Sequence, residues 1–199
     1  MAAAPPTILV VGDSLSAEYG LKRGTGWVAL LERKLAAERL PAQVVNASIS
    51  GDTTSGGRSR LPALLERHRP EVVVIELGAN DALRGLPLGM TEENLDQMAG
   101  SARKASARVL LVGMRMPPNY GADYANRFAA LYEKAARSNN AGLVPFLLKG
   151  VADSADPIAL FQADRIHPKE EAQPLLLGNV WPELMKMLAG GKASGKRRP

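Results

Sequence analysis

The 199-residue chain is long enough for one domain with a substantial core, and its 46% hydrophobic and 23% charged residues are typical of globular proteins. This composition excludes a disordered, collagen-like or coiled-coil chain, and the absence of cysteine excludes a disulfide scaffold, a cysteine nucleophile and cysteine-ligated metal centres. Only two histidines are present, His68 and His167, so a histidine-rich metal site is not expected and a catalytic imidazole must be one of these two.

The residues before position 7 form a short lead. Residues 1–6 lack the charged and apolar regions of a complete signal peptide, but their Ala- and Pro-rich sequence is what remains after cleavage at a small-residue site. We therefore expect a processed export signal or an added start codon here. The expected location is periplasmic or secreted, with the cytoplasm as the alternative. No apolar run approaches the roughly 18 residues that span a bilayer, so no membrane span is predicted.

Short β-branched and apolar runs alternate with helical patterns over residues 7–189. The runs predict strands at 7–11, 43–47, 72–77, 109–112 and 143–146. Between them, apolar residues recur at the spacing of one-faced helices, and a last helix is predicted from Leu177, Trp181, Leu184 and Leu188. Strands that are apolar on both sides belong to a parallel sheet covered on both faces. We therefore predict a single α/β domain over 7–189, a three-layer, doubly wound, flavodoxin-like fold with five parallel strands.

The net charge of +5 comes mostly from the end of the chain. The last ten residues carry four basic side chains and no acidic one, and without them the net charge falls to +1. A segment of Gly, Ser, Lys and Arg is typical of a solvated end, with weak attachment to an anionic surface as the alternative. We therefore expect residues 190–199 to be a basic disordered tail, and we expect no nucleic-acid partner.

Small and chemically reactive residues follow the predicted strands. These segments are 12–15, 48–54, 78–81 and 114–120, with 164–168 downstream of the fifth strand. In an open α/β sheet, ligands bind beyond the carboxyl ends of the strands, where these segments converge. The sequence therefore predicts a functional site at this edge of the sheet.

Four of these segments resemble the sequence blocks of the SGNH (GDSL-type) hydrolase superfamily. The blocks are Gly-Asp-Ser-Leu at 12–15, Gly51, Gly-x-Asn-Asp at 78–81 and Asp-x-x-His at 164–167, and the resemblance covers about residues 7 to 189. Residues 12–17, 80–85 and 118–121 are similar to the bacterial group of acyl-CoA thioesterases I, lysophospholipases and arylesterases. Glu18 departs from that pattern, which has a small residue there, so we expect it to alter the mouth of the pocket.

Ester hydrolysis needs a nucleophile, a base, a group that orients the base, and donors for the oxyanion. Ser14 is the candidate nucleophile, although a serine after a strand is often a helix N-cap. His68 ends a predicted helix at the opposite edge of the sheet, so we interpret it as structural. His167 lies on the same edge as Ser14, and Asp164 can accept a hydrogen bond from its Nδ1–H. We therefore predict Ser14, His167 and Asp164 as the catalytic residues.

Three N–H donors are candidates for an oxyanion hole. They are the backbone N–H groups of Ser14 and Gly51 and the side-chain amide of Asn80. Gly51 and Asn80 could equally be ordinary turn residues, and the four blocks together favour the catalytic role. The neighbouring carboxylates are interpreted as braces for these loops: Asp13, Asp52 and Asp81.

Apolar residues in the loops 82–90 and 114–120 predict an acyl-binding surface. The candidates are Leu83, Leu86, Pro87, Leu88, Met116, Pro117, Asn119 and Tyr120. Such a lining favours medium or long acyl chains or aryl esters, and the resemblance implies thioester, lysophospholipid and aryl-ester hydrolysis. The expected partner is a small acyl ester or thioester, with a lipid surface as a further source of substrate. Neither a metal nor an organic cofactor is expected, and no oligomeric state is predicted.

Two other functions compete with this interpretation. A carbohydrate acetylesterase on the same fold would need a polar, sugar-stacking cleft, and the Leu-, Met- and Pro-rich loops argue against it. A non-catalytic binding protein on a degenerate hydrolase fold would lack the serine, the histidine or the asparagine, and all three are present. We therefore predict a serine esterase or thioesterase that acts through an acyl-enzyme on Ser14.

Overall fold

Five parallel strands form one sheet in the computed structural model, which describes residues 4–194. The strands are β1 (Thr7–Gly12), β2 (Gln43–Asn46), β3 (Val72–Glu76), β4 (Arg108–Val112) and β5 (Gly142–Val144). Their order across the sheet is β2-β1-β3-β4-β5, which is the flavodoxin-like doubly wound order. The predicted fold class is therefore confirmed.

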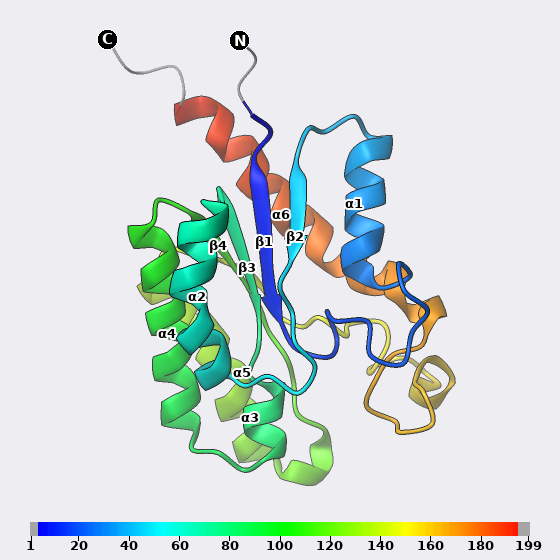
Figure 1. Ribbon diagram of the computed structural model, residues 1–199. Coiled ribbons are helices and arrows are strands. Elements are labelled where there is room, and N and C mark those ends of the chain that lie inside the picture. The colour runs from blue at the N-terminus through cyan, green and yellow to red at the C-terminus, as the bar shows by residue number, and fades with distance from the viewer. Residues whose placement is uncertain (1–3, 195–199) are drawn as a thin grey trace.

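Helices cover both faces of the sheet and make three layers (Figure 1). Helices α1 (Trp27–Ala37) and α6 (Gln173–Ser194) pack together on one face. Helices α2 (Thr54–His68), α4 (Leu88–Lys104) and α5 (Ala122–Ser138) pack side by side on the other. The short helix α3 (Ala79–Leu83) follows β3, and single 3₁₀ turns lie at Pro118–Tyr120, Pro157–Leu160 and Glu170–Ala172.

The two central strands carry the core. Residues 8–11 of β1 and 72–75 of β3 are fully buried, so both faces of these strands are covered. Trp27 of α1 is buried on one side of the sheet, and Phe128 and Tyr132 of α5 are buried on the other. Burying one such side chain is worth about 1.5–3 kcal/mol, so these strands form a rigid base for the loops that follow them.

The fifth strand is shorter than the sequence predicts. A strand was expected over 143–146, but β5 ends at Val144 because Pro145 has no N–H to donate to the ladder. The N–H of Leu147 instead donates to the carbonyl of Gly113 at 2.9 Å. The segment after β5 therefore stays close to the end of β4 while it leaves the sheet.

The last helix is longer than expected. Helix α6 continues to Ser194, into the segment for which a disordered tail was expected from residue 190. The rest of that predicted tail, 195–199, and residues 1–3 of the predicted lead lie outside the described residues. Between residues 4 and 194, no helix has the length and hydropathy to cross a membrane.

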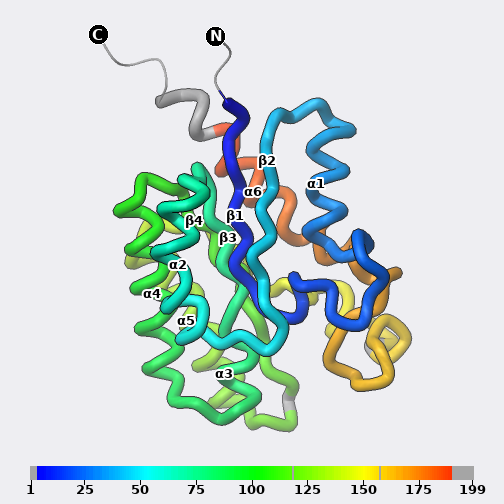
Figure 2. Tube along the Cα trace, viewed as in Figure 1, coloured from blue at the N-terminus to red at the C-terminus, as the bar shows by residue number. Residues whose placement is uncertain are grey.

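The carboxyl ends of all five strands point to one edge of the sheet. The strand order reverses between β1 and β3, and such a reversal opens a crevice beyond the strand ends. Figure 2 shows the loops that follow the strands at this edge, with the start of β1 at the opposite one. Residues that follow β1 and β3 are therefore placed to face each other across the crevice.

Candidate active site

Ser14 lies directly after β1, where the chain turns sharply out of the sheet. Gly12 has no room for a side chain, because a Cβ atom there would lie 2.8 Å from both Glu76 Oε2 and Ser16 Oγ. Beyond it the chain forms a helical turn, in which the N–H of Ala17 donates to the carbonyl of Asp13 at 2.9 Å. This turn leaves Ser14 half-buried.

The three residues predicted to be catalytic lie in one line of hydrogen bonds. Ser14 Oγ is 2.8 Å from His167 Nε2, and His167 Nδ1 is 2.7 Å from Asp164 Oδ2. Ser14 and His167 are 153 positions apart in the sequence. The fold therefore brings a hydroxyl near the start of the chain to an imidazole near its end.

Asp164 fixes the orientation of the imidazole. Its Oδ1 accepts the backbone N–H groups of Ile166 at 2.9 Å and His167 at 3.0 Å. Burial alone would raise the pKa of Asp164, but these two hydrogen bonds and the imidazole outweigh it and lower the pKa to about 2. The carboxylate is therefore ionised at neutral pH and accepts the Nδ1–H, which leaves the Nε2 lone pair facing Ser14.

The predicted oxyanion donors differ in their availability. Asn80 lines the same cavity as Ser14, and its Nδ2 donates to Asp13 Oδ2 at 3.0 Å and to the carbonyl of Asp52 at 2.9 Å. Both amide hydrogens thus have acceptors, so an oxyanion must displace one of them. Gly51 stands at φ +79°, a backbone conformation that favours glycine, and does not line the cavity. Within residues 4–194, the backbone N–H groups of Ser14 and Gly51 donate to no protein acceptor.

A pair of buried carboxyl groups lies beneath the nucleophile. Glu76 at the end of β3 is fully buried, and its Oε2 accepts from Ser16 Oγ at 2.7 Å and from the N–H of Asp13 at 3.4 Å. Glu76 Oε1 is buried without a partner among the described residues. Burial raises the pKa of Asp13 to about 6, and burial together with the Asp13 carboxylate raises the pKa of Glu76 well above its usual range. The pair therefore retains a proton at mildly acidic pH.

Replacing Glu76 by glutamine should make the stability of the protein less dependent on pH. The folded chain binds these protons more tightly than the unfolded chain does, so their contribution is complete below about pH 4. The Asp13 part is lost as the pH rises through about 6, and burial raises the pKa of Glu76 so that its part is lost well above the usual range of a glutamate. In Glu76→Gln the uncharged side-chain amide can still accept the hydrogen bond from Ser16 Oγ through its oxygen. The fall in unfolding free energy between about pH 5 and about pH 8 should therefore be smaller than in the wild type, because the neutral amide has no proton to lose.

Urea unfolding at both pH values measures this difference. Glu66 on α2 is exposed, so Glu66→Gln is the matched control and should leave the pH dependence unchanged. A Glu76→Gln protein that loses as much stability as the wild type between the two pH values would contradict the assignment of a buried proton to this pair.

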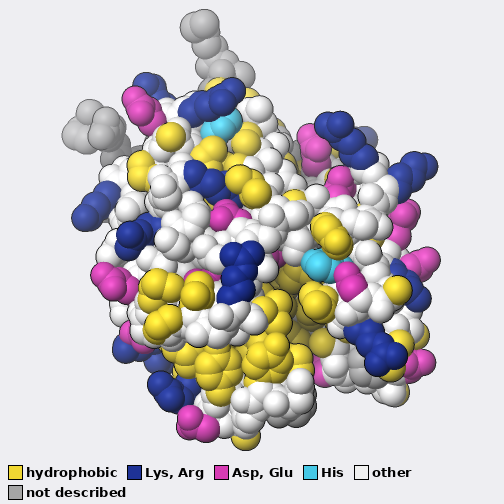
Figure 3. All heavy atoms as spheres, turned by 60° about the horizontal axis from the view of Figure 1, so that its bottom comes forward, with side chains coloured by type: hydrophobic (Ala, Val, Ile, Leu, Met, Phe, Trp, Pro, Cys, Tyr) yellow, Lys and Arg dark blue, Asp and Glu magenta, His cyan; other side chains and the backbone are white. Residues whose placement is uncertain are grey.

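A cavity of about 260 Å³ opens beside Ser14 and His167. Its apolar walls are formed by Leu15, Ala79, Leu83, Met114, Met116, Pro117, Phe146, Leu148, Ala152, Phe161 and Ile166. Arg115 and Arg165 are exposed residues that also border it. Figure 3 looks onto this edge of the molecule and shows hydrophobic side chains gathered around a hollow.

The predicted acyl-binding residues divide into two groups. Leu83, Met116 and Pro117 line the cavity. The others do not line it: Leu86, Pro87, Leu88, Asn119 and Tyr120. Leu88 begins α4 and packs against the core, and the ring of Tyr120 lies against that of Tyr124 with centroids 6.4 Å apart.

The cavity takes its remaining walls from segments that the sequence interpretation did not assign to substrate binding. Phe146, Leu148 and Ala152 come from the segment after β5, and Phe161 and Ile166 come from the loop around His167. The signal that could have found the first group is their position, since they follow a strand end as the other site residues do. Their apolar character made them resemble core residues instead.

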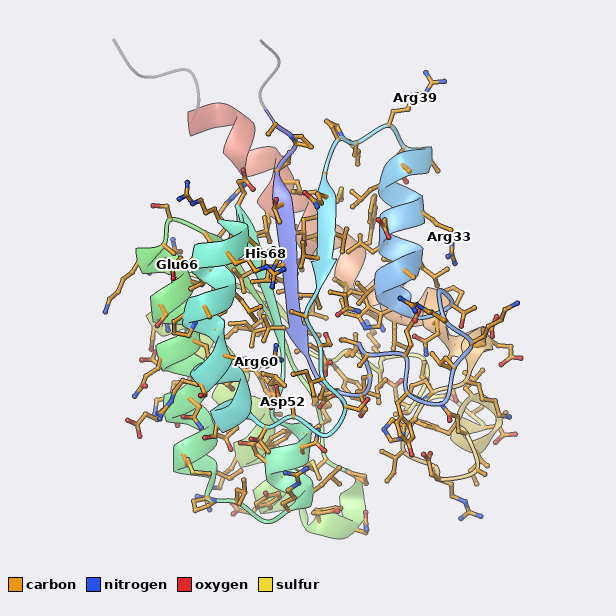
Figure 4. The ribbon with its side chains drawn as sticks, viewed as in Figure 1. Arg33, Arg39, Asp52, Arg60, Glu66 and His68 are labelled. Atoms are coloured by element: carbon orange, nitrogen blue, oxygen red, sulfur yellow. The ribbon has the colours of Figure 1, made fainter. Side chains whose placement is uncertain are left out.

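Two other residues singled out in the sequence lie away from the cavity. Glu18, expected to alter the pocket mouth, has φ +61°, and its carboxylate accepts the N–H groups of Gly24 at 3.0 Å and Gly26 at 2.9 Å. It braces its own loop and does not line the cavity. His68 is the last residue of α2, and Figure 4 labels it far along the helix from Asp52 at the carboxyl edge. This position agrees with its interpretation as a structural residue.

The neighbouring aspartates brace the loops, as predicted. Asp52 Oδ1 accepts the N–H of Thr53 at 3.0 Å, and its Oδ2 pairs with Arg60 at 2.8 Å (Figure 4). Asp81 Oδ2 accepts the N–H of Thr54 at 2.9 Å. These contacts join the loop after β2 to α2 and α3. Within residues 4–194, no group of three or more His, Asp or Glu side chains is arranged to hold a metal ion.

A serine, a histidine and an aspartate joined by hydrogen bonds at the carboxyl edge of an α/β sheet define a hydrolase. The chain matches the model of the GDSL-like Lipase/Acylhydrolase family over residues 10–174, and it belongs to this family. The resemblance stated from the sequence is therefore confirmed.

Several similar proteins are named as esterases or thioesterases. Esterase TesA of Pseudomonas aeruginosa is 52% identical over 94% of this chain and 91% of its own, and the arylesterase of Vibrio mimicus is 42% identical over 91% and 89%. Thioesterase 1/protease 1/lysophospholipase L1 of Escherichia coli is 43% identical over 88% of this chain and 81% of its own. A crystal structure of TesA matches with a TM-score of 0.88 at 51% identity, covering 91% of this chain and 99% of that one.

Proposed function

We propose that the chain is a serine esterase and thioesterase that releases acyl chains from carboxylic esters and thioesters through an acyl-enzyme on Ser14. The observation that carries the proposal is the line of hydrogen bonds from Asp164 through His167 to Ser14 Oγ, which ends at the wall of an apolar cavity. The names of the relatives, which include an esterase, an arylesterase and a thioesterase/lysophospholipase, support it.

The reaction proceeds in two halves. Ser14 Oγ attacks the acyl carbonyl carbon while His167 Nε2 takes the hydroxyl proton, and the Asp164 carboxylate stabilises the imidazolium. His167 then gives this proton to the leaving alcohol or thiol, and the acyl group stays on Ser14. In the second half His167 takes a proton from water as the water oxygen attacks the acyl-enzyme. The same proton returns to Ser14 Oγ when the carboxylic acid leaves, so one water is consumed for each bond cleaved.

Negative charge on the carbonyl oxygen is stabilised by N–H donors in this scheme. The backbone N–H groups of Ser14 and Gly51 are available, because they have no acceptor within residues 4–194. Asn80 joins them by exchanging one of its two present acceptors for the oxyanion. Removing one such donor typically costs on the order of 10²–10³ in turnover.

The size and lining of the cavity favour medium-length acyl chains. The cavity of about 260 Å³ beside Ser14 gives an acyl chain apolar walls to lie against. Its walls are mostly apolar and offer few partners to the hydroxyl groups of a sugar. This lining disfavours a carbohydrate acetylesterase.

A panel of p-nitrophenyl esters with acyl chains of about 2 to 16 carbons, run beside acyl-CoA and lysophospholipid, tests the proposal. We expect a higher kcat/KM for medium-length acyl chains than for acetyl, because the walls of the cavity are mostly apolar. Fastest turnover of the acetyl ester would contradict the assignment of the cavity to the acyl chain. Faster turnover of an acetylated sugar than of any ester in the panel would favour the acetylesterase instead.

We also propose that the enzyme acts in the periplasm or after secretion and draws part of its substrate from lipid surfaces. The lysophospholipase activity in the name of the Escherichia coli relative supports lipid substrates. Fractionation of the native cells, followed by an esterase assay of each fraction, tests the location.

A further inference from the structure

The segment that carries Ser14 and the loop that carries His167 are joined by more than the hydrogen bond between these two residues. Figure 2 shows the segment after β1 beside the segment that precedes α6. Because the two segments come from opposite ends of the chain, the alignment of Ser14 with His167 depends on the contacts between them. Two side chains outside the line of catalytic residues make those contacts, Tyr19 and Gln162.

Gln162 connects the two segments through hydrogen bonds. Its side-chain Nε2 donates to the carbonyl of Tyr19 at 3.0 Å and to the carbonyl of Pro168 at 3.1 Å. Its backbone N–H donates to the carbonyl of His167 at 2.8 Å, and its carbonyl accepts the N–H of Arg165 at 2.9 Å. The main chain of Gln162 therefore closes the His167 loop, while its side chain ties that loop to the segment after Ser14.

The packing around this amide is tight. Gly20 has φ +69°, and a Cβ atom there would lie 2.0 Å from Gln162 Oε1, so the amide occupies the space that a side chain at position 20 would need. The N–H of Tyr19 donates to the carbonyl of Ser14 at 3.3 Å. The position of Gln162 is therefore set relative to the helical turn that begins at the nucleophile.

Tyr19 also contacts the imidazole directly. The centroids of the Tyr19 and His167 rings are 4.4 Å apart, with their planes tilted by 38°. The tyrosine is 51% exposed, so burial in the core does not explain its position. Its ring covers one face of the imidazole and limits the rotation of that ring away from Ser14.

We propose that Tyr19 and Gln162 are positioning residues that hold His167 in line with Ser14 Oγ, an inference that rests on the catalytic roles proposed above. Neither residue lines the cavity, so they act on proton transfer and not on substrate binding. A displacement of about 1 Å in a reacting group can cost on the order of 10²-fold in rate. Loss of either side chain should therefore lower kcat and leave KM nearly unchanged.

Gln162→Ala and Gln162→Glu test the hydrogen bonds. Glutamate keeps the size of the side chain but cannot donate to the two carbonyls while it is ionised. We expect both variants to lose about 10- to 100-fold in kcat, with KM within about twofold of the wild type. Gln97→Ala is the matched control, because the amide of Gln97 also bridges two side chains, Arg58 and Glu93, but from α4. This control should retain full kcat.

Tyr19→Leu and Tyr19→Phe test the ring contact. Phenylalanine keeps the ring and should restore kcat to within about twofold of the wild type, whereas leucine should lose about tenfold or more. The double variant Tyr19→Leu with Gln162→Ala should lose less than the product of the two single losses, because both side chains position the same imidazole. Thermal unfolding of each variant sets an assay temperature at which all of them are folded.

Wild-type kcat in folded Gln162→Ala or Tyr19→Leu would overturn the proposal. Equal losses in Tyr19→Phe and Tyr19→Leu, or a rise in KM at constant kcat, would also overturn it. Failure of the catalytic assignment itself has a different signature, namely full turnover in Ser14→Ala, and that measurement does not involve Tyr19 or Gln162.

Discussion

Replacing Ser14 by alanine should lower kcat on p-nitrophenyl hexanoate by on the order of 10⁶-fold, since the acyl-enzyme can no longer form. The residual rate should be the part that substrate binding and the oxyanion donors supply without a nucleophile. The hydrogen bond of Ser14 Oγ with His167 is the one side-chain bond that the hydroxyl makes among the described residues. The fold should therefore be retained, with the free energy of unfolding within about 0.5 kcal/mol of the wild type.

Covalent labelling separates a lost nucleophile from a damaged site. After incubation with an alkyl fluorophosphonate, the wild type should gain the mass of one adduct, and Ser14→Ala should gain none. Ser154 also lies in a loop near this edge and does not line the cavity, so Ser154→Ala should keep both the label and the activity. Wild-type-like hydrolysis by Ser14→Ala would refute the mechanism.

Replacing His167 by alanine should lower kcat by at least about 10⁴-fold, because no other group can take the Ser14 proton. The imidazole is the one base within hydrogen-bonding distance of Ser14 Oγ among residues 4–194, and Asp164 fixes its orientation. The steady-state rate on p-nitrophenyl hexanoate measures the loss, and the fluorophosphonate should label Ser14 far more slowly in this variant.

His68 is the matched control for this experiment. It ends α2 at the opposite edge of the sheet, where a histidine side chain interacts favourably with the helix dipole. His68→Ala should therefore keep kcat and lose at most about 1 kcal/mol of stability. An inactive His68→Ala together with an active His167→Ala would show that the histidine was assigned from the wrong edge of the sheet.

Most of the fold could be predicted because the central strands contain uninterrupted runs of apolar residues. Residues 8–11 and 72–75 are apolar at every position, and only a sheet covered on both faces buries both sides of a strand. Once the strands are parallel, the segments that follow them must meet at one edge. The meeting of Ser14 with His167 therefore follows from topology, even though the two are far apart in sequence.

Side-chain direction was harder to predict than position. Leu88 follows the same strand as Leu83, but α4 begins at Leu88 and turns it toward the core, while Leu83 faces the cavity. Glu76 sits at the end of an otherwise apolar strand, and such a carboxyl indicates a buried polar network. The contacts of Gln162 with Tyr19 had no local sequence signal, because they join segments that meet only in the folded chain.

The separation of 153 positions between hydroxyl and imidazole also determines when the chain gains its activity. During synthesis the ribosome releases Ser14 early and His167 near the end, so a nascent or prematurely terminated chain that lacks residue 167 has no base. The sheet can be complete at that stage while no ester bond is broken. Because the His167 loop leads directly into α6, which packs against α1, regain of hydrolysis after dilution from denaturant requires the docking of that last helix as well as the formation of the strands.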